Sequence, residues 1–220
     1  MQAIIIGAGG HGKVVLDILR SANTCEPVGF VDANASMAGQ IIGGLPVLGP
    51  INLLPKLRQQ KKIKAAIVAI GDNRARMKYA DLLREQGFDL INAIHPSASV
   101  SATASLGQNI VVAPHACICT EAKIADSAII NTAAVVDHEC EIGAGAHICP
   151  GVHLAGRVRI ANRAMIGIGA NVIQCIAIGS DAIIGAGAAV IRDVPDGATA
   201  VGVPARVIKV AERDLVLSEA

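Results

Sequence analysis

The chain has 220 residues, enough for two modest domains, and its 19 Lys and Arg balance 18 Asp and Glu to a net charge of +1. No basic run exceeds Lys61-Lys62, which argues against nucleic acid or an acidic membrane as a partner. The mean hydropathy of +0.52 is high, but no apolar run approaches the ~20 residues of a membrane-spanning helix. The N-terminus enters a strand without a basic region or cleavage site, so we expect a cytoplasmic protein.

The first thirty residues predict a nucleotide-binding unit. Residues 3–6 form a short apolar strand, and the glycine-rich segment GAGGHG follows at 7–12. A helix over 13–20 follows, and then a second strand over 28–31 that ends at Asp32. The order strand, glycine turn, helix, strand and acidic residue is that of half of a dinucleotide-binding unit. Glycines let the backbone approach a phosphate, and the helix N-terminus favours its negative charge. The carboxylate of Asp32 is placed to accept a hydrogen bond from a ribose hydroxyl.

This glycine pattern is also compatible with NAD, but the segment before residue 91 has room for only about half of a full dinucleotide fold. The later elements fit a small parallel sheet of Rossmann-like type. They are a strand over 66–70 followed by Gly71, a helix over 74–86, and a last strand over 90–94. We therefore predict a first domain over 1–93 and a second over 94–220.

The second domain is a repeat of six residues. From Ile94 to Val190, every sixth residue is Ile, Val or Leu, at seventeen positions without a slip of frame, and a small residue usually follows four positions later. Helical cores repeat near 3.6 residues and half-buried strands at 2, so neither fits. Three six-residue sides close a triangular coil of eighteen residues, and stacked coils form a parallel β-helix. Because the frame is unbroken, we predict no long loop leaving the coils.

The residues with catalytic potential lie within 131–156, which holds three of the six histidines. His138 follows an inward position by two residues, so we expect it near a corner, facing outward. Gly156, eighteen residues later, should leave open space beside the imidazole. A histidine near neutral pKa can take a proton from an attacking amine, and the neighbouring Glu139 can fix its tautomer and raise its basicity.

Other interpretations remain open. Zinc binding by His138, His147 and His153 would need convergence, whereas these residues lie on different sides of one coil. An acyl-enzyme on Cys140 conflicts with its small inward slot, where a thiol is buried and inert. The six cysteines form no CxxC pair and are expected to be buried, reduced thiols. A non-catalytic solenoid is the alternative to an enzyme.

The segment GAGGHGKVV at 7–15, followed by hexapeptide repeats, resembles the sugar O- and N-acyltransferase family. This family includes bacterial nucleotide-linked 4-amino-sugar N-acetyltransferases and sialic acid O-acetyltransferases. The resemblance implies a left-handed β-helix after a small α/β Rossmann-like domain, a homotrimer, acetyl-CoA as co-substrate and no metal. The segment VGVPAR at 201–206 is similar to the family's terminal motif, with a tail over 207–218 predicted to cover the last coil as a strand or short helix.

By position, the resemblance implies three groups of site residues. These are His138 as base with Glu139 as its partner; Gly9, Gly10, His11, Asp32, Ala33 and Gly71 around a nucleotide-linked sugar; and His147, Ile168 and Ala186 against acetyl-CoA. The family can carry two adjacent acids after the second strand, whereas Ala33 follows Asp32 here, so the nucleobase stays open. The expected reaction is direct acetyl transfer to the 4-amino group of a nucleotide-linked deoxyamino sugar. O-acetylation of sialic acid or a related sugar, or non-catalytic binding of a nucleotide-sugar, is the alternative.

Overall fold

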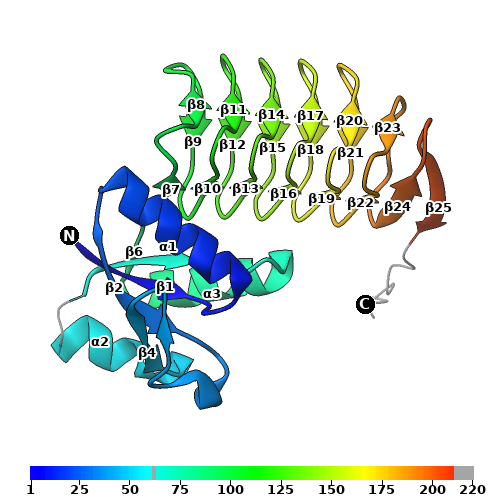
Figure 1. Cartoon of the computed structure of the whole chain (residues 1–220). Helices are drawn as coiled ribbons and strands as arrows, with labels where there is room; N and C mark the ends of the chain where they lie inside the picture. Colours follow the sequence, from blue (N-terminus) through cyan, green and yellow to red (C-terminus); the bar gives the residue numbers. More distant parts are fainter. Residues whose placement is uncertain (61–62, 211–220) are drawn as a thin grey trace, which may run out of the picture.

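Two differently built parts make up the chain in the computed structural model, which describes residues 1–60 and 63–210 (Figure 1). The first is an α/β unit around one sheet, and the second is a column of stacked three-sided coils. The α/β unit contains β1 (Gln2–Ile6), α1 (Gly10–Ala22), β2 (Glu26–Val31), η1 (Ala35–Met37), β3 (Ile41–Ile42), β4 (Leu45–Gly49), η2 (Ile51–Leu53), α2 (Leu54–Gln60), β5 (Ala65–Val68), α3 (Asn73–Glu85) and β6 (Asp89–Leu90).

The sheet of the α/β unit has the order β3-β4-β2-β1-β5-β6 and is parallel except for the β3–β4 hairpin. Its central strand β1 is buried on both faces, which explains the unbroken apolar run at 3–6. Helix α1 packs Val15 and Ile18 against one face, whereas α2 and α3 pack Leu57 and Leu83 against the other. The strands predicted over 3–6, 28–31 and 66–70 and both predicted helices are present, whereas the hairpin and α2 were not predicted.

The expected strand over 90–94 is wrong as a single element. It is two short strands, β6 and β7 (Ala93–Ile94), which belong to different sheets. Asn92 lies between them, donates to Gly107 O at 2.8 Å and accepts from Ile110 N at 2.9 Å. The chain therefore leaves the α/β sheet and joins the first coil at this residue. Helix α1 also starts three residues earlier than predicted, so that His11 lies in its first turn.

The hexapeptide repeat forms one two-residue strand per six residues, without an intervening long loop, as predicted. The first face contains β7, β10 (Val111–Val112), β13 (Ile129–Ile130), β16 (His147–Ile148), β19 (Met165–Ile166), β22 (Ile183–Ile184), β24 (Ala198–Val201) and β25 (Arg206–Val210). The second face contains β8 (Ser99–Val100), β11 (Cys117–Ile118), β14 (Val135–Val136), β17 (His153–Leu154), β20 (Asn171–Val172) and β23 (Ala189–Val190). The third face contains β9 (Ser105–Leu106), β12 (Lys123–Ile124), β15 (Glu141–Ile142), β18 (Arg159–Ile160) and β21 (Ala177–Ile178).

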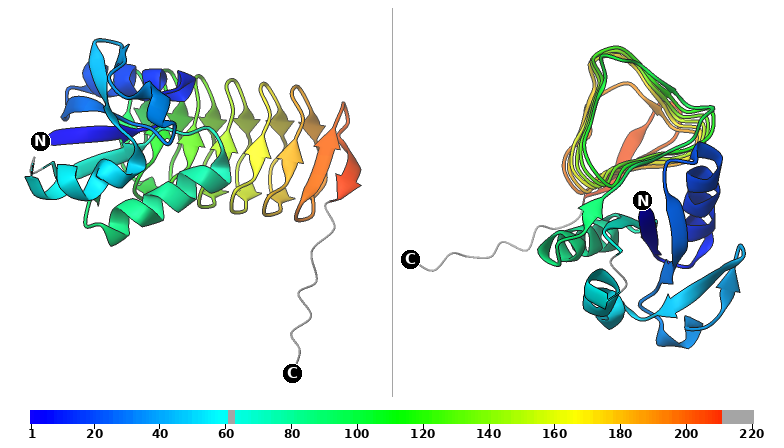
Figure 2. Two further views of the ribbon diagram at one scale, coloured as in Figure 1. Left: turned by 90° about the horizontal axis from the view of Figure 1, so that it is seen from below. Right: turned by 90° about the vertical axis from the view of Figure 1, so that its left-hand side faces the viewer.

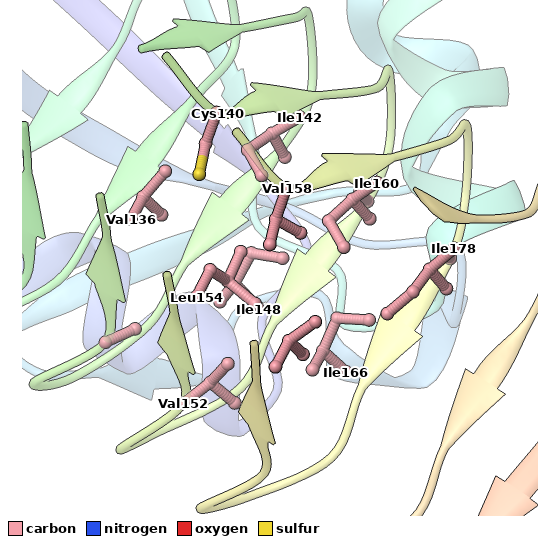
Figure 3. Close-up of a cluster of buried hydrophobic side chains, with 14 of the residues drawn as sticks. Val136, Cys140, Ile142, Ile148, Val152, Leu154, Val158, Ile160, Ile166 and Ile178 are labelled. Carbon is pink, nitrogen blue, oxygen red and sulfur yellow. The ribbon is translucent and has the colours of Figure 1, made fainter. Parts of the chain in front are cut away.

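Viewed along its axis, the column is a triangle (Figure 2). Each strand pairs in parallel with the strand eighteen residues later, for example Val111 with Ile129. The sixth-residue aliphatic side chains point into the interior, together with the residues four positions after them (Figure 3). Cys140 and Val158 occupy two of these slots and are fully buried. The structure therefore confirms the predicted fold class, a small α/β domain followed by a left-handed parallel β-helix.

The corners of the coils have a feature that the sequence pattern did not reveal. The third residue after almost every inward anchor adopts a left-handed backbone, with φ near +60°. This position is occupied by glycine in some coils, but also by Ala133, Glu139 and Arg157. Each corner therefore places two consecutive outward residues on a fixed backbone turn. His138 and Glu139 are such a pair.

The α/β unit lies against the first face of the triangle (Figure 2). The outward residues of that face near the N-terminal coils, Val111 and Ile129, are fully buried in one cluster with Val15 and Ile18 of α1. At the other end, β25 pairs antiparallel with β24 and closes the first face. The predicted tail is therefore a strand as far as Val210, and its remainder, 211–218, lies outside the described residues. No helix within the described residues is long and apolar enough to cross a membrane.

Arg76 of α3 joins the two parts and is fully buried. Its guanidinium donates to Ile70 O, Gly71 O and Asn73 Oδ1 in the α/β unit, and to Ser127 O and Gly145 O in the β-helix, at 2.7–3.1 Å. Burial lowers the pKa of Arg76 to about 10, so it stays charged at neutral pH. A buried cation is tolerated because all of these acceptors point at it.

Candidate active site

The glycine turn forms one wall of a cavity of about 310 Å³ at the carboxyl ends of the parallel strands. All six residues predicted to bind the nucleotide-sugar line it: Gly9, Gly10, His11, Asp32, Ala33 and Gly71. Gly9 caps α1 without a side-chain hydrogen bond, and neither Gly9 nor Gly10 has an atom within 4 Å of its missing Cβ. The helix N-terminus therefore presents open backbone to the cavity, which suits an anionic phosphate.

Asp32 shapes this turn. Its Oδ2 accepts from Ala8 N at 2.8 Å and its Oδ1 from Asn34 N at 2.9 Å. The carboxylate thus holds the glycine segment against the end of β2, and each oxygen keeps a lone pair for a ligand hydroxyl. Ile51 and Tyr79 also line the cavity. They come from η2 and α3, outside the glycine motif, so no local pattern identified them.

His138 lies at the corner between the second and third faces, as predicted. Its backbone N donates to Asp137 Oδ1 at 2.7 Å, and its Nδ1 lies 3.0 Å from Glu139 Oε2. Hydrogen bonds from Arg157 and then from His138 lower the pKa of Glu139, so this carboxylate is ionised and can only accept. Nδ1 of His138 must therefore carry the proton, which leaves the lone pair of Nε2 free to accept another.

The expected open space beside His138 is filled by the imidazole itself. A Cβ atom at Gly156 would collide with Nε2, Cε1 and Cδ2 of His138. The ring therefore lies against Gly156 of the next coil, where only glycine leaves room for it. Arg157 follows directly, and its Nε donates to Glu139 Oε2 at 2.9 Å. The sequence pattern did not identify this third member of the group.

His147 lies on the first face, on the side of the α/β unit. Its Nε2 is 3.1 Å from Nδ2 of Asn131, whose Oδ1 accepts from Thr132 N at 2.8 Å. This second bond fixes the amide, so Nδ2 donates to His147 and Nε2 is unprotonated. Burial, with smaller contributions from Arg76 and His11, lowers the pKa of His147 to about 4. His147 is therefore a neutral imidazole whose Nδ1–H is a donor.

His11 shares these surroundings. Burial and the charge of Arg76 lower its pKa to about 4, and its buried Nε2 has no hydrogen-bond partner among the described residues. Because His11 and Arg76 both contribute to the lowered pKa of His147, the predicted acetyl-CoA contact lies within electrostatic range of the predicted sugar site. The sequence placed these two histidines in separate groups.

Ile168 and Ala186 are exposed and stack in successive coils at the corner between the first and second faces. His138 lies at the next corner, with the whole second face between them. One chain therefore does not bring the proposed base to the edge predicted to hold acetyl-CoA. His147, His138 and His153 likewise lie on different sides of the triangle. Among residues 1–60 and 63–210, no three metal-binding side chains are placed to hold one ion.

The cysteines are free thiols. Cys140 is buried, donates to Ala155 O at 3.2 Å, and has a pKa raised by burial, so it is no accessible nucleophile. The expectation that the thiols are buried holds for Cys140 and Cys149 only. Cys25, Cys117 and Cys119 are half-buried, and Cys175 is exposed. Cys175 occupies a left-handed corner position, where a side chain points outward.

The β-helix carries a histidine that is hydrogen-bonded to a carboxylate, and the α/β unit has a glycine-lined cavity suited to a phosphate. Together these features define a hexapeptide-repeat acyltransferase. Residues 2–83 match the family described as the PglD N-terminal domain. The solved structure of a histidine-to-asparagine mutant of perosamine N-acetyltransferase from Caulobacter crescentus, in complex with CoA and GDP-perosamine, is 44% identical with a TM-score of 0.91, covering 94% of this chain and 96% of that one. The acetyltransferase domain of PglB from Neisseria gonorrhoeae, in complex with acetyl-CoA, is 39% identical with a TM-score of 0.87, over 94% and 98%.

A curated relative, UDP-N-acetylbacillosamine N-acetyltransferase of Bacillus subtilis, is 37% identical over 109 residues. That match spans about half of each protein, 49% of this chain and 49% of the relative. The chain belongs to the family of acetyl-CoA-dependent sugar N-acetyltransferases that combine a PglD-type N-terminal domain with a hexapeptide-repeat β-helix.

Proposed function

We propose that this protein transfers the acetyl group of acetyl-CoA to the 4-amino group of a nucleotide-linked deoxyamino sugar. The structural match to an enzyme that binds CoA and GDP-perosamine, at 44% identity over 94% of the chain, carries this proposal. Residues 1–93 would bind the nucleotide-sugar through the glycine-turn cavity, and 94–220 would hold acetyl-CoA and the base. Two of the three relatives above are named as N-acetyltransferases, which favours an amine over a hydroxyl acceptor.

His138 would act as the general base. As the sugar nitrogen attacks the thioester carbonyl, Nε2 accepts the amine proton and the positive charge that develops on the ring is stabilised by Glu139. The tetrahedral intermediate then collapses, the C–S bond breaks, and the imidazolium can return its proton to the leaving CoA thiolate. The amide product and free CoA account for all atoms, without an acyl-enzyme. The neutral His147 would donate from Nδ1 to acetyl-CoA.

A coupled thiol assay tests the reaction. The protein is incubated with acetyl-CoA and with UDP-, dTDP- or GDP-linked 4-amino-4-deoxy sugars, and CoA release is followed together with the product mass. We expect release with at least one amino sugar and none with the matched sugar that carries a 4-hydroxyl. Acetylation of the hydroxyl sugar alone would assign O-transfer. No release and no acetyl-CoA binding would indicate a non-catalytic solenoid.

We further propose a homotrimer. Within one chain, His138 lies at a different corner of the triangle from Ile168 and Ala186, and a second subunit would bring the two corners together. Ile168, Ile173 and Ile191 are 61%, 43% and 41% exposed, and the last two stack beside the corner of His138. Exposed aliphatic residues in such columns are typical of a surface that another subunit covers.

Light scattering is expected to give about three times the 22.4 kDa of one chain. Mixed oligomers of inactive His138→Ala and Ile168→Asp variants should recover part of the activity, because some interfaces then combine both intact edges. A monomer at micromolar concentration, or no recovery in mixtures whose subunits have exchanged, would contradict a shared site.

We also place the protein in the cytoplasm. Acetyl-CoA and nucleotide-sugars are cytoplasmic metabolites, and six free thiols suit a reducing compartment.

A further inference from the structure

Arg157 contacts the proposed catalytic pair from the next coil. Its Nε donates to Glu139 Oε2 at 2.9 Å, and Nδ1 of His138 is 3.0 Å from the same oxygen. The two donors therefore share one carboxylate oxygen, which can accept both hydrogen bonds, and together they fix its position. Arg157 itself is held by its backbone N, which donates to His138 O at 2.9 Å.

The corner geometry explains why these groups meet. Glu139 and Arg157 are eighteen residues apart and both adopt the left-handed corner backbone, with φ of 57° and 62°. Their side chains therefore leave adjacent coils in the same direction. Gly156, immediately before Arg157, leaves room for the His138 ring. Two consecutive residues of one coil thus position the imidazole and its carboxylate on the coil before.

Several charged side chains surround Glu139, and Arg157 is hydrogen-bonded to it. Both line a polar cavity of about 450 Å³, together with Glu121, Lys123, Glu141 and Arg159. Lys123 is paired with Glu141 at 3.1 Å, and Glu121 occupies the position eighteen residues before Glu139 in the same corner column. Asp137 adds a further negative charge beside the base, bonded to the backbone N of His138. Among the described residues of this cavity, the cation that donates a hydrogen bond to Glu139 is Arg157.

We propose that Arg157 is a positioning residue for acetyl transfer: it holds Glu139 in the conformer that orients His138 and limits the negative charge which that carboxylate presents to the base. It acts through Glu139 and does not contact the reacting atoms. This inference rests on the proposed roles of His138 and Glu139.

Arg157→Gln tests the inference by steady-state kinetics over a range of pH. We expect kcat to fall about 3- to 5-fold, the upper end of the contribution of an exposed ion pair. The acid limb of the kcat profile should move to higher pH, because removal of a neighbouring cation makes protonation of the imidazole easier. KM for either substrate should change little. Arg157→Lys, which keeps the charge and one donor, should restore kcat to within about twofold and the original acid limb.

Arg159→Gln is the matched control. It removes the same charge two residues away in the same cavity, and no side-chain hydrogen bond joins Arg159 to Glu139 in the described part of the chain. Its kcat and acid limb should stay close to those of the parent enzyme. The decisive measurement is a double-mutant cycle with Glu139→Gln, in which Arg157→Gln should add almost nothing once the carboxylate is gone.

The outcomes separate the two proposals. A raised KM for acetyl-CoA with unchanged kcat, additive effects in the cycle, or an unmoved acid limb would overturn the role of Arg157 and indicate ligand contact or a structural effect. If Arg157→Gln leaves kcat unchanged while His138→Ala and Glu139→Gln lower it, only this inference fails. If His138→Ala is fully active, the proposed function of the pair fails with it.

Discussion

Replacement of His138 by alanine is expected to lower kcat by roughly 10²–10⁴-fold, the usual contribution of a positioned general base. This corresponds to about 3–5 kcal/mol of transition-state stabilisation. The ring is bonded to Glu139 through Nδ1 and leaves Nε2 free over Gly156, so the substitution removes the accepting atom and little of the hydrophobic core. The parent enzyme should lose activity as pH falls and the imidazole is protonated, and that limb should vanish in the variant.

Two further substitutions serve as controls for this measurement. His147→Ala should act mainly through KM for acetyl-CoA, because the proposed role of its neutral Nδ1–H is to donate a hydrogen bond to acetyl-CoA and not to act as the base. Glu139→Gln should reduce kcat by less than His138→Ala does, because the base remains but is less basic and less well oriented. If His138→Ala turns over at the parent rate as an intact oligomer, His138 is not the base.

The largest effect on stability is expected for Arg76→Met. The substitution leaves four backbone carbonyls and Asn73 Oδ1 without their donor at the joint between the two parts. Removing one side of a buried charged network typically costs about 3–5 kcal/mol. For a chain of this size we expect the unfolding midpoint to fall by roughly 10 °C, measured by calorimetry or circular dichroism.

Arg74→Met is the matched control for this loss. Arg74 lies two residues earlier on α3, pairs with Asp181 at 2.8 Å, and its side chain is 73% exposed. An exposed pair of this kind contributes about 0–1 kcal/mol, so its midpoint should move little. Equal losses in the two variants would show that the buried network does not hold the α/β unit to the β-helix.

The predictions from sequence agree with the structure for those positions whose surroundings recur in every coil. An inward aliphatic residue every six positions specifies the coil, because each coil must bury the same narrow interior. The same six-residue spacing is enough to place His138 at a corner and Gly156 beside it on the neighbouring coil. The glycine turn predicted its cavity for a similar reason, since backbone approach to a phosphate requires residues without side chains.

The docking of the α/β unit and the side-chain contacts between coils depend on tertiary structure and do not follow from the six-residue period. The repeat is the same on all three faces, so it does not say which face the α/β unit covers. That docking brings His147 within electrostatic range of His11 and buries Arg76. The repeat does not say how outward side chains pair between coils, so Arg157 on Glu139 was missed. Nor does it say that His138 and Ile168 lie at different corners of the triangle, so that only a second chain would bring them together. The physical reason is that burial in the column is a local, repeated constraint that the sequence must satisfy at every coil, whereas each of these contacts occurs once and depends on surfaces far apart in the chain.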